Sequence, residues 1–303
     1  MSASPDLSLA LPVYNGAQAG IGRLIEDLLR DPFDRIEVVV SDNGSTDATP
    51  DILADLDGTD PRLRIHRFEA NQGIQANFNK VLGLSQGTYF KWCAAGDLIL
   101  PGYLDRMVGH LRNHPATTVA HCVFDFSDGT MRMDRGTHWR REFDRRIIGA
   151  TTHRLAAVRV RGNFRFYGYG GHFFGVHRRA LVERLGGHAE YAGTDRVLTS
   201  ELAALGPFHW DPEVLWSCYC PPVEKPNYVE DGLIDGDDYP DIERIFLDRK
   251  RFAELPTLES TSVRALLQGE RLALRLRQGV ARRLLSPAAG RGRGAEGSRA
   301  ERR

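Results

Sequence analysis

Short apolar runs alternate with segments of helical periodicity through the first 115 residues of the chain. Ile36–Ser41 is a compact run of β-branched residues, which is typical of a strand buried on both faces. In Ile21–Arg30 and Gln75–Ser85, apolar residues recur at the spacing of one helix face. Strands and helices that alternate with short loops predict parallel strands joined by crossover helices. The other strands predicted in this half are Leu7–Val13, Leu63–Arg67 and Thr88–Cys93.

The pattern becomes less regular after about residue 115. Thr118–Phe126 predicts one more strand, and Asp195–Leu205 predicts an amphipathic helix. We expect one α/β domain with an open, mostly parallel sheet flanked by helices, in which residues 1–115 and 116–255 form two halves. Beyond it we expect an amphipathic helix at 256–285 and a disordered tail at 286–303, which is rich in Gly, Arg, Ser and Ala.

The net charge argues against binding to nucleic acid, and the distribution of charge bears on the role of the C-terminal helix. Of the 303 residues, 40 are Lys or Arg and 40 are Asp or Glu, so no basic excess favours nucleic acid as a partner. We expect the C-terminal helix to pack on its own domain. The last 48 residues hold 11 Arg and 4 Glu, a balance of +7, which supports peripheral contact of this helix with an anionic membrane as the alternative. Pairing with a second subunit in a homodimer is a further alternative.

Nothing in the sequence indicates export or a spanning segment. The first 16 residues lack the basic start of a signal peptide, and no apolar run approaches the roughly 20 residues that span a bilayer. The four cysteines are too few for a disulfide framework. We therefore expect a cytoplasmic protein, with the inner face of the membrane as the place of any peripheral contact.

Polar clusters follow three of the predicted strands, at Pro12–Asn15, Asp42–Ser45 and Ala94–Asp97. Ligands of open parallel sheets bind at the carboxyl ends of the strands, so these clusters predict one shared site. The sequence contains no P-loop and no Gly- and Lys-rich activating loop of a nucleotidyltransferase. After the second cluster, Ser45 or Thr46 is expected to cap a helix whose first turn contains Pro50.

Four blocks of sequence resemble successive blocks of family 2 glycosyltransferases, and a later stretch, Gly193–Trp216, is similar to the block that supplies the catalytic base in that family. The resemblance runs from about Leu7 to Tyr219. It implies the GT-A fold, with a nucleotide-sugar-binding half at 1–115 and an acceptor half at 116–255. It also implies inverting transfer of a sugar from a nucleoside-diphosphate sugar, here expected to be a UDP-sugar, to an acceptor hydroxyl. The four blocks are Leu9–Gly16, Val38–Thr49, Asn71–Asn79 and Gly87–Ile99.

The resemblance assigns donor-binding roles to residues of these blocks. Tyr14 offers a ring face for stacking on a base, and Asp42 can accept the N–H of a pyrimidine. Asn77 is expected to line the donor pocket, with a helix cap as the alternative. The full donor set is Pro12, Tyr14, Asn15, Asp42, Asn43, Gly44, Ser45, Asn71, Gly73, Asn77 and Asp97.

The loop Ala94–Asp97 departs from the family pattern. Most relatives carry two or three Asp there and bind a divalent cation that bridges the diphosphate, whereas this chain keeps only Asp97. We expect Mg²⁺ or Mn²⁺ to bind through Asp97 together with the donor's diphosphate. Residues 217–221 also replace an Arg and a His that relatives often carry. Both departures motivate a second hypothesis, a weak or inactive GT-A relative that binds a nucleotide sugar or a partner.

Asp195 matches the position of the family's catalytic base, which takes the proton of the acceptor hydroxyl. A helix cap is its alternative role. On the acceptor side the candidates are Trp92, Gly171 and His172, although the sequence favours a core position for Trp92 and a structural role for His172. The acceptor itself, whether a glycan, a lipid-linked sugar or a small natural product, is not identified.

Overall fold

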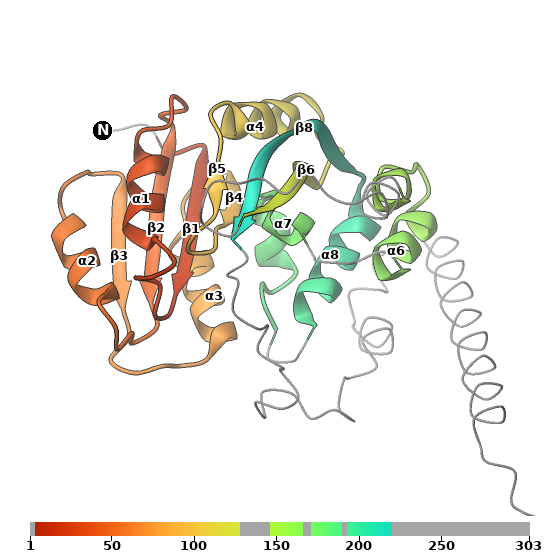
Figure 1. Ribbon diagram of the computed structural model, residues 1–303. Coiled ribbons are helices and arrows are strands. Elements are labelled where there is room, and N and C mark those ends of the chain that lie inside the picture. Colours follow the sequence, from red (N-terminus) through yellow and green to blue (C-terminus); the bar gives the residue numbers. More distant parts are fainter. Residues whose placement is uncertain (1–3, 128–145, 166–170, 190–192, 220–303) are drawn as a thin grey trace, which may run out of the picture.

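The computed structural model describes residues 4–127, 146–165, 171–189 and 193–219. One eight-stranded sheet, of strand order β3-β2-β1-β4-β7-β6-β8-β5, runs through the whole described part (Figure 1). The strands are β1 (Leu7–Val13), β2 (Ile36–Asp42), β3 (Leu63–Arg67), β4 (Tyr89–Trp92), β5 (Leu98–Ile99), β6 (Val119–Ser127), β7 (Val176–Arg178) and β8 (Phe208–Tyr219).

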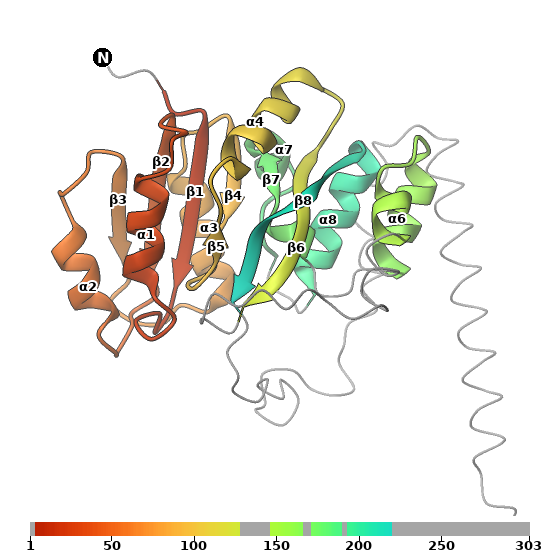
Figure 2. The same ribbon diagram turned by 45° about the horizontal axis from the view of Figure 1, so that its top comes forward.

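Helices cover both faces of this sheet, as Figure 2 shows. Apolar residues of α1, α2 and α4 fill one core with the sheet, and those of α3, α7 and α8 fill the other. β4 illustrates why, because its successive side chains alternate between the two cores, Tyr89 in the first and Phe90 in the second. The helices are α1 (Ile21–Leu29), α2 (Thr49–Leu56), α3 (Ile74–Leu84), α4 (Tyr103–Asn113), α6 (Ala156–Arg165), α7 (Arg179–Arg184), α8 (Thr194–Leu205) and the 3-10 helix η1 (Gly171–Phe174).

The first four strands are parallel, as the alternating pattern predicts. β1 lies between β2 and β4, and β3 lies beyond β2. In the second half β7 runs antiparallel to both β4 and β6, while β8 is parallel to β6 and antiparallel to β5. The expected open, mostly parallel α/β sheet is confirmed, and the antiparallel β7 joins the two halves.

One predicted helix cap is wrong, and one helix was not predicted. The helix after β2 begins at Thr49 with Ala48 as its cap residue, and neither Ser45 nor Thr46 caps it. Pro50 does lie in the first turn, as expected. The sequence reading also omitted α4, although its buried residues recur at helical spacing; they are Tyr103, Leu104, Met107, Val108 and Leu111.

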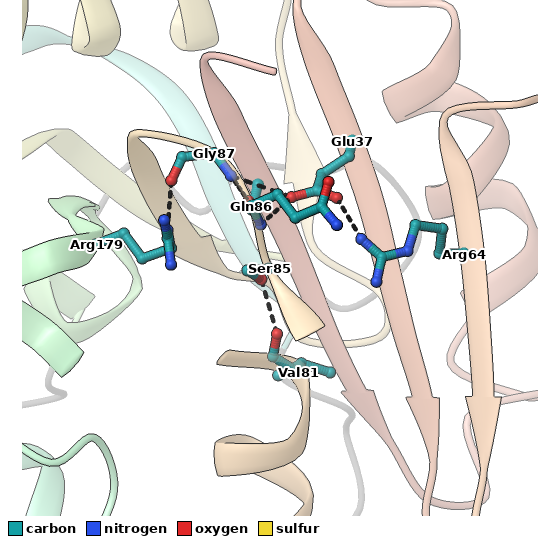
Figure 3. A network of polar contacts seen from close by, with 8 residues as sticks. Glu37, Arg64, Val81, Ser85, Gln86, Gly87 and Arg179 are labelled. Carbon is teal, nitrogen blue, oxygen red and sulfur yellow. Dashed lines mark hydrogen bonds and ion pairs between the residues drawn. The ribbon is translucent and has the colours of Figure 1, made fainter. Parts of the chain in front are cut away.

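A polar network closes the amino-terminal edge of the sheet (Figure 3). The buried carboxylate of Glu37 on β2 accepts hydrogen bonds from the Ser8 hydroxyl (2.6 Å) and from the backbone N–H groups of Gln86 and Gly87. Its second oxygen pairs with Arg64 Nη1 of β3 at 3.0 Å. All four donors belong to the scaffold, so this carboxylate is fully used in joining β1, β2, β3 and the start of β4.

The predicted helix at 256–285 and the tail at 286–303 lie outside the described residues, as does the part of the second half at 220–255. Within the described ranges, every helix is too short or too polar to cross a bilayer. The division of the domain at residue 115 stays a prediction.

Candidate functional site

Four loops converge at the carboxyl edge of the sheet. Backbone hydrogen bonds join the ends of adjacent strands there: the N–H of Asn43 donates to the Val13 carbonyl, Phe68 N–H to Asp42, and Cys93 N–H to Ala10, each at 2.8–2.9 Å. The side chain of Asn77 on α3 also donates to the Val13 carbonyl, at 3.2 Å. The three polar clusters predicted from the sequence therefore lie at one edge of the sheet.

The loops after β1 and β2 are fastened to each other by polar contacts. The backbone N–H of Asn15 donates to Ser45 Oγ (2.8 Å), and Asn15 Oδ1 accepts from the N–H of Thr46 (2.9 Å). The N–H of Gly16 donates to Thr49 Oγ1 at 2.8 Å. Asn15 adopts φ 52°, a left-handed conformation that Asn tolerates better than most residues. Asn15 and Ser45 thus hold the shape of the edge.

Asn43 fastens the third loop to the second. Its Nδ2 donates to Asn71 Oδ1 (2.9 Å) and to the Gly73 carbonyl (3.1 Å), and its Oδ1 accepts from the N–H of Gln72 (2.9 Å). Gly44 has φ +71°, and a Cβ there would lie 2.7 Å from the Ala70 carbonyl carbon. Only glycine permits this close approach of the two loops.

Asp42 is the last residue of β2, and its side chain is fully buried. Oδ1 accepts from the backbone N–H of Ser45 at 2.9 Å. Arg67 Nε lies 3.3 Å from Oδ2 in an ion pair, but the direction of its N–H makes no hydrogen bond, so Oδ2 receives none from the described residues. The carboxylate therefore keeps one oxygen with acceptor capacity.

Tyr14 and Asn77 occupy opposite environments at this edge. Tyr14 is 47% exposed, so its side chain is accessible for the predicted stacking on a base. Asn77, on α3, is buried, and its side-chain amide donates a hydrogen bond to the carbonyl of Val13 at the end of β1. The cap alternative for Asn77 is wrong, because Gly73 is the cap residue of α3. Pro12 is half-buried within β1, paired with Ser41.

Asp97 lies in the loop between β4 and β5, and its side chain is buried. Its Oδ2 accepts from the backbone N–H of Ala94 at 3.0 Å, which closes the loop upon itself. The next two residues form β5 and pair with Trp216 and Ser217 of β8, so the ends of β4 and β8 meet at this loop. Within the described ranges, no group of three or more His, Cys, Asp or Glu could hold a metal ion.

Asp195 is the second residue of α8, whose cap residue is Gly193. The cap alternative for Asp195 is therefore wrong. The end of α8 lies near the start of β6, where Thr118 Oγ1 bonds the Leu202 carbonyl (3.1 Å), so its beginning lies toward the carboxyl edge. His188 packs on Phe78 of α3, with ring centroids 5.0 Å apart. Burial lowers the pKa of His188 to about 4, against the opposing charge of Asp195.

The three residues assigned to the acceptor side require correction. Trp92 is fully buried, and its indole stacks on Phe173 with ring centroids 4.6 Å apart, so it is a core residue. A Cβ on Gly171 would lie 2.1 Å from the Phe124 ring, which makes this glycine a packing requirement. His172 is buried and bonds Asn163 Oδ1 through Nε2 at 2.7 Å. Their burial leaves none of the three available to an acceptor.

Buried histidines make the fold sensitive to acid. Burial lowers the pKa of His172 to about 3 and that of His177 to about 4, whereas both would titrate near 6.5 in the unfolded chain. The unfolded chain therefore binds more protons as the pH falls below 6.5, and stability decreases until the pH reaches the folded-state pKa.

We expect the free energy of unfolding to fall between about pH 7 and about pH 5, by up to roughly 1.4 kcal/mol per pH unit for each such histidine. Urea unfolding at several pH values measures this loss. His177→Gln should flatten the dependence. An unfolding free energy that stays constant over this range would contradict the assignment of neutral, buried imidazoles.

Arg67 lies at the same edge of the sheet and was not among the site residues predicted from the sequence. It ends β3 just as Asp42 ends β2, and a charged residue at the carboxyl end of a predicted strand was the available signal. Thr49, whose Oγ1 accepts the hydrogen bond from the Gly16 N–H in the loop after β1, was not among the predicted residues either.

The family model described as Glycosyl transferase family 2 matches residues 8–183. The chain belongs to this family. The match includes every donor residue proposed from the sequence and ends before Asp195. EpsH of Bacillus subtilis (strain 168) is 26% identical to this family 2 chain over 200 residues, which is 56% of the chain and 57% of EpsH. The chain thus spans little more than half the length of that relative.

Solved structures agree with the fold. Residues 1–349 of S. aureus TarS, in a crystal structure in complex with UDP-GlcNAc, are 17% identical with a TM-score of 0.64; the alignment covers 85% of this chain and 69% of that one. The mannosyltransferase PcManGT from Pyrobaculum calidifontis, in complex with GDP-Man and Mn²⁺, is 20% identical with a TM-score of 0.55, covering 94% of this chain and 82% of that one. The GT-A fold of this family 2 member is thereby confirmed.

Proposed function

We propose that this family 2 chain is an inverting glycosyltransferase that moves a sugar from a UDP-sugar to an acceptor hydroxyl. One observation supports the proposal: Asp42, whose Oδ2 receives no hydrogen bond from the described residues, pairs in the sheet with Val13, the residue before the exposed Tyr14. A flat base with an N–H edge, such as uracil, suits a ring face and a carboxylate together. TarS, which has this fold, is known in complex with UDP-GlcNAc.

The reaction is a single displacement. The acceptor oxygen attacks the anomeric carbon, the bond from that carbon to the diphosphate breaks, and the nucleoside diphosphate leaves with the electron pair. Asp195 takes the proton of the acceptor hydroxyl, a role that suits a carboxylate in the first turn of a helix starting toward the donor edge. The acceptor is a glycan, a lipid-linked sugar or a small natural product.

A binding screen tests the donor. Thermal unfolding is followed with UDP, UDP-sugars, GDP and GDP-mannose, because a ligand that binds only the folded state raises the melting temperature. We expect UDP and at least one UDP-sugar to raise it more than the guanine nucleotides do. A larger rise with GDP or GDP-mannose would contradict uracil as the base.

The metal follows from the chemistry of the site. We infer that Mg²⁺ or Mn²⁺ binds only when a diphosphate supplies further oxygens beside Asp97, the single carboxylate of the Ala94–Asp97 loop. PcManGT, of the same fold, is known with Mn²⁺. When bound there, the cation would offset the negative charge of the departing diphosphate.

We therefore expect Mn²⁺ to bind the protein detectably in the presence of UDP and not in its absence. Calorimetric titration of Mn²⁺ with and without UDP measures the difference, and Asp97→Asn should abolish it. If EDTA leaves donor turnover unchanged, or if Asp97→Asn keeps full activity, the metal role is wrong.

A second candidate is a non-catalytic relative that binds a nucleotide sugar or a partner. It is favoured by the single carboxylate of the Ala94–Asp97 loop and by Ser217, which pairs with Leu98 beside that loop at the end of β8. Retained UDP-sugar binding with no release of UDP, with or without Mn²⁺, would favour this candidate over the enzyme.

A further inference from the structure

The same two strands, β2 and β3, carry two arginine–carboxylate pairs at opposite edges of the sheet. At the amino-terminal edge Arg64 Nη1 lies 3.0 Å from Glu37 Oε2, and Glu37 also accepts three hydrogen bonds from the scaffold (Figure 3). At the carboxyl edge Arg67 pairs with Asp42, its neighbour in the strand register. The two pairs share their strands and charges, so their differences indicate their functions.

The Asp42 pair is incomplete where the Glu37 pair is complete. Asp42 is fully buried, yet it accepts a single hydrogen bond, from the Ser45 N–H, and its Oδ2 receives none from the described residues. Leaving a buried acceptor without a donor destabilises the fold, so such an atom calls for a ligand or another explanation. The scaffold satisfies Glu37 and leaves Asp42 with spare capacity at the edge that binds ligands.

Arg67 fixes this carboxylate from the solvent side. Its Nε lies 3.3 Å from Asp42 Oδ2, and its Nη2 donates to the Ser45 carbonyl at 3.2 Å, so the guanidinium bridges the strand end and the following turn. Half of the Arg67 side chain is exposed, at 52%, while Asp42 is at 0%. The arginine can therefore yield space to an incoming group without burying a new charge, while its own charge keeps the carboxylate paired.

We propose that Arg67 is a positioning residue of the donor site: through its ion pair it holds Asp42 in the orientation that accepts an N–H of the donor base. This inference rests on the proposed function. Arg67 acts through Asp42, so its removal should loosen donor binding and leave the chemical step unchanged.

The test is a double-mutant cycle on UDP affinity, measured by calorimetry on the full chain. Arg67→Gln should weaken UDP binding about tenfold, and Arg67→Lys, which keeps the charge, should recover part of the loss. In an Asp42→Asn background, Arg67→Gln should change the affinity by less than about twofold, since the residue it positions is already altered. The matched control Arg64→Gln, in the same strand, should leave UDP affinity unchanged.

Each other outcome has a definite meaning. If Asp42→Asn weakens UDP binding while Arg67→Gln leaves it unchanged or tightens it, the positioning role is overturned and the proposed function stands. If Arg67→Gln weakens binding equally in both backgrounds, Arg67 acts independently of Asp42, and the role is again overturned. If the wild type does not bind UDP, or Asp42→Asn has no effect, the proposed donor site fails, and the role of Arg67 fails with it. A fall in kcat with unchanged KM for the donor would also contradict positioning.

Discussion

Replacing Asp195 with asparagine is expected to lower the rate of sugar transfer by about 10²- to 10⁴-fold, the usual contribution of a positioned general base. The amide keeps the shape of the side chain and cannot take the proton of the acceptor hydroxyl. Asp195 lies in the first turn of α8, whose cap residue is Gly193, so the fold does not depend on this carboxylate for a cap. Loss of its charge near the helix start should cost only about 0.3–1 kcal/mol of stability.

Release of UDP from a UDP-sugar measures the rate, with water or a supplied hydroxyl compound as acceptor. UDP affinity and melting temperature should stay close to those of the wild type. Glu183→Gln, the same chemical change on the partly exposed face of α7, is the control and should keep full activity. If activity of Asp195→Asn falls only in proportion to a loss of folded protein, its role is structural.

Replacing Asp42 is expected to weaken UDP binding by about 10- to 150-fold, which corresponds to a charge-assisted hydrogen bond worth roughly 1.5–3 kcal/mol. Asp42→Asn is the cleaner variant, because its amide oxygen can still accept from the Ser45 N–H. Asp42→Ala removes that acceptor as well and leaves Arg67 without its carboxylate, so it should also lower the melting temperature.

Calorimetry with UDP measures the affinity, and the rate of donor cleavage at saturating donor separates binding from chemistry. For Asp42→Asn we expect the donor KM to rise while kcat remains near the wild-type value. Unchanged UDP affinity in a folded Asp42→Asn protein would remove this residue from the site.

Periodicity in the sequence was sufficient to predict the four parallel strands of the first half of the fold. The bounds predicted for Leu7–Val13 and Leu63–Arg67 are those of β1 and β3, because each run is bounded by clear loop signals. The two-residue β5 and the antiparallel direction of β7 could not be predicted from the sequence, since they depend on pairing between segments far apart in the chain. α4 was predictable in principle, as its apolar residues follow helical spacing.

Contacts between distant segments also decide which parts of the site could be predicted from the sequence. The strand-end clusters could be placed together from topology alone, because the carboxyl ends of parallel strands meet at one edge. The pairing of Asp42 with Arg67 depends on the register of β2 and β3, which the sequence does not reveal. Trp92 was misassigned for a related reason: its neighbours on the sheet, and not its type, put it against Phe173 in the core.

The most direct test of the proposed reaction is proton NMR of a UDP-sugar incubated with the full chain, Mn²⁺ and a hydroxyl acceptor or water. Starting from an α-linked UDP-sugar, we expect consumption of the donor and the β anomer as the first sugar product, before mutarotation mixes the forms. Cleavage that yields the α anomer would contradict single displacement. A donor that binds and is never consumed would contradict the assignment of this family 2 member as an active glycosyltransferase.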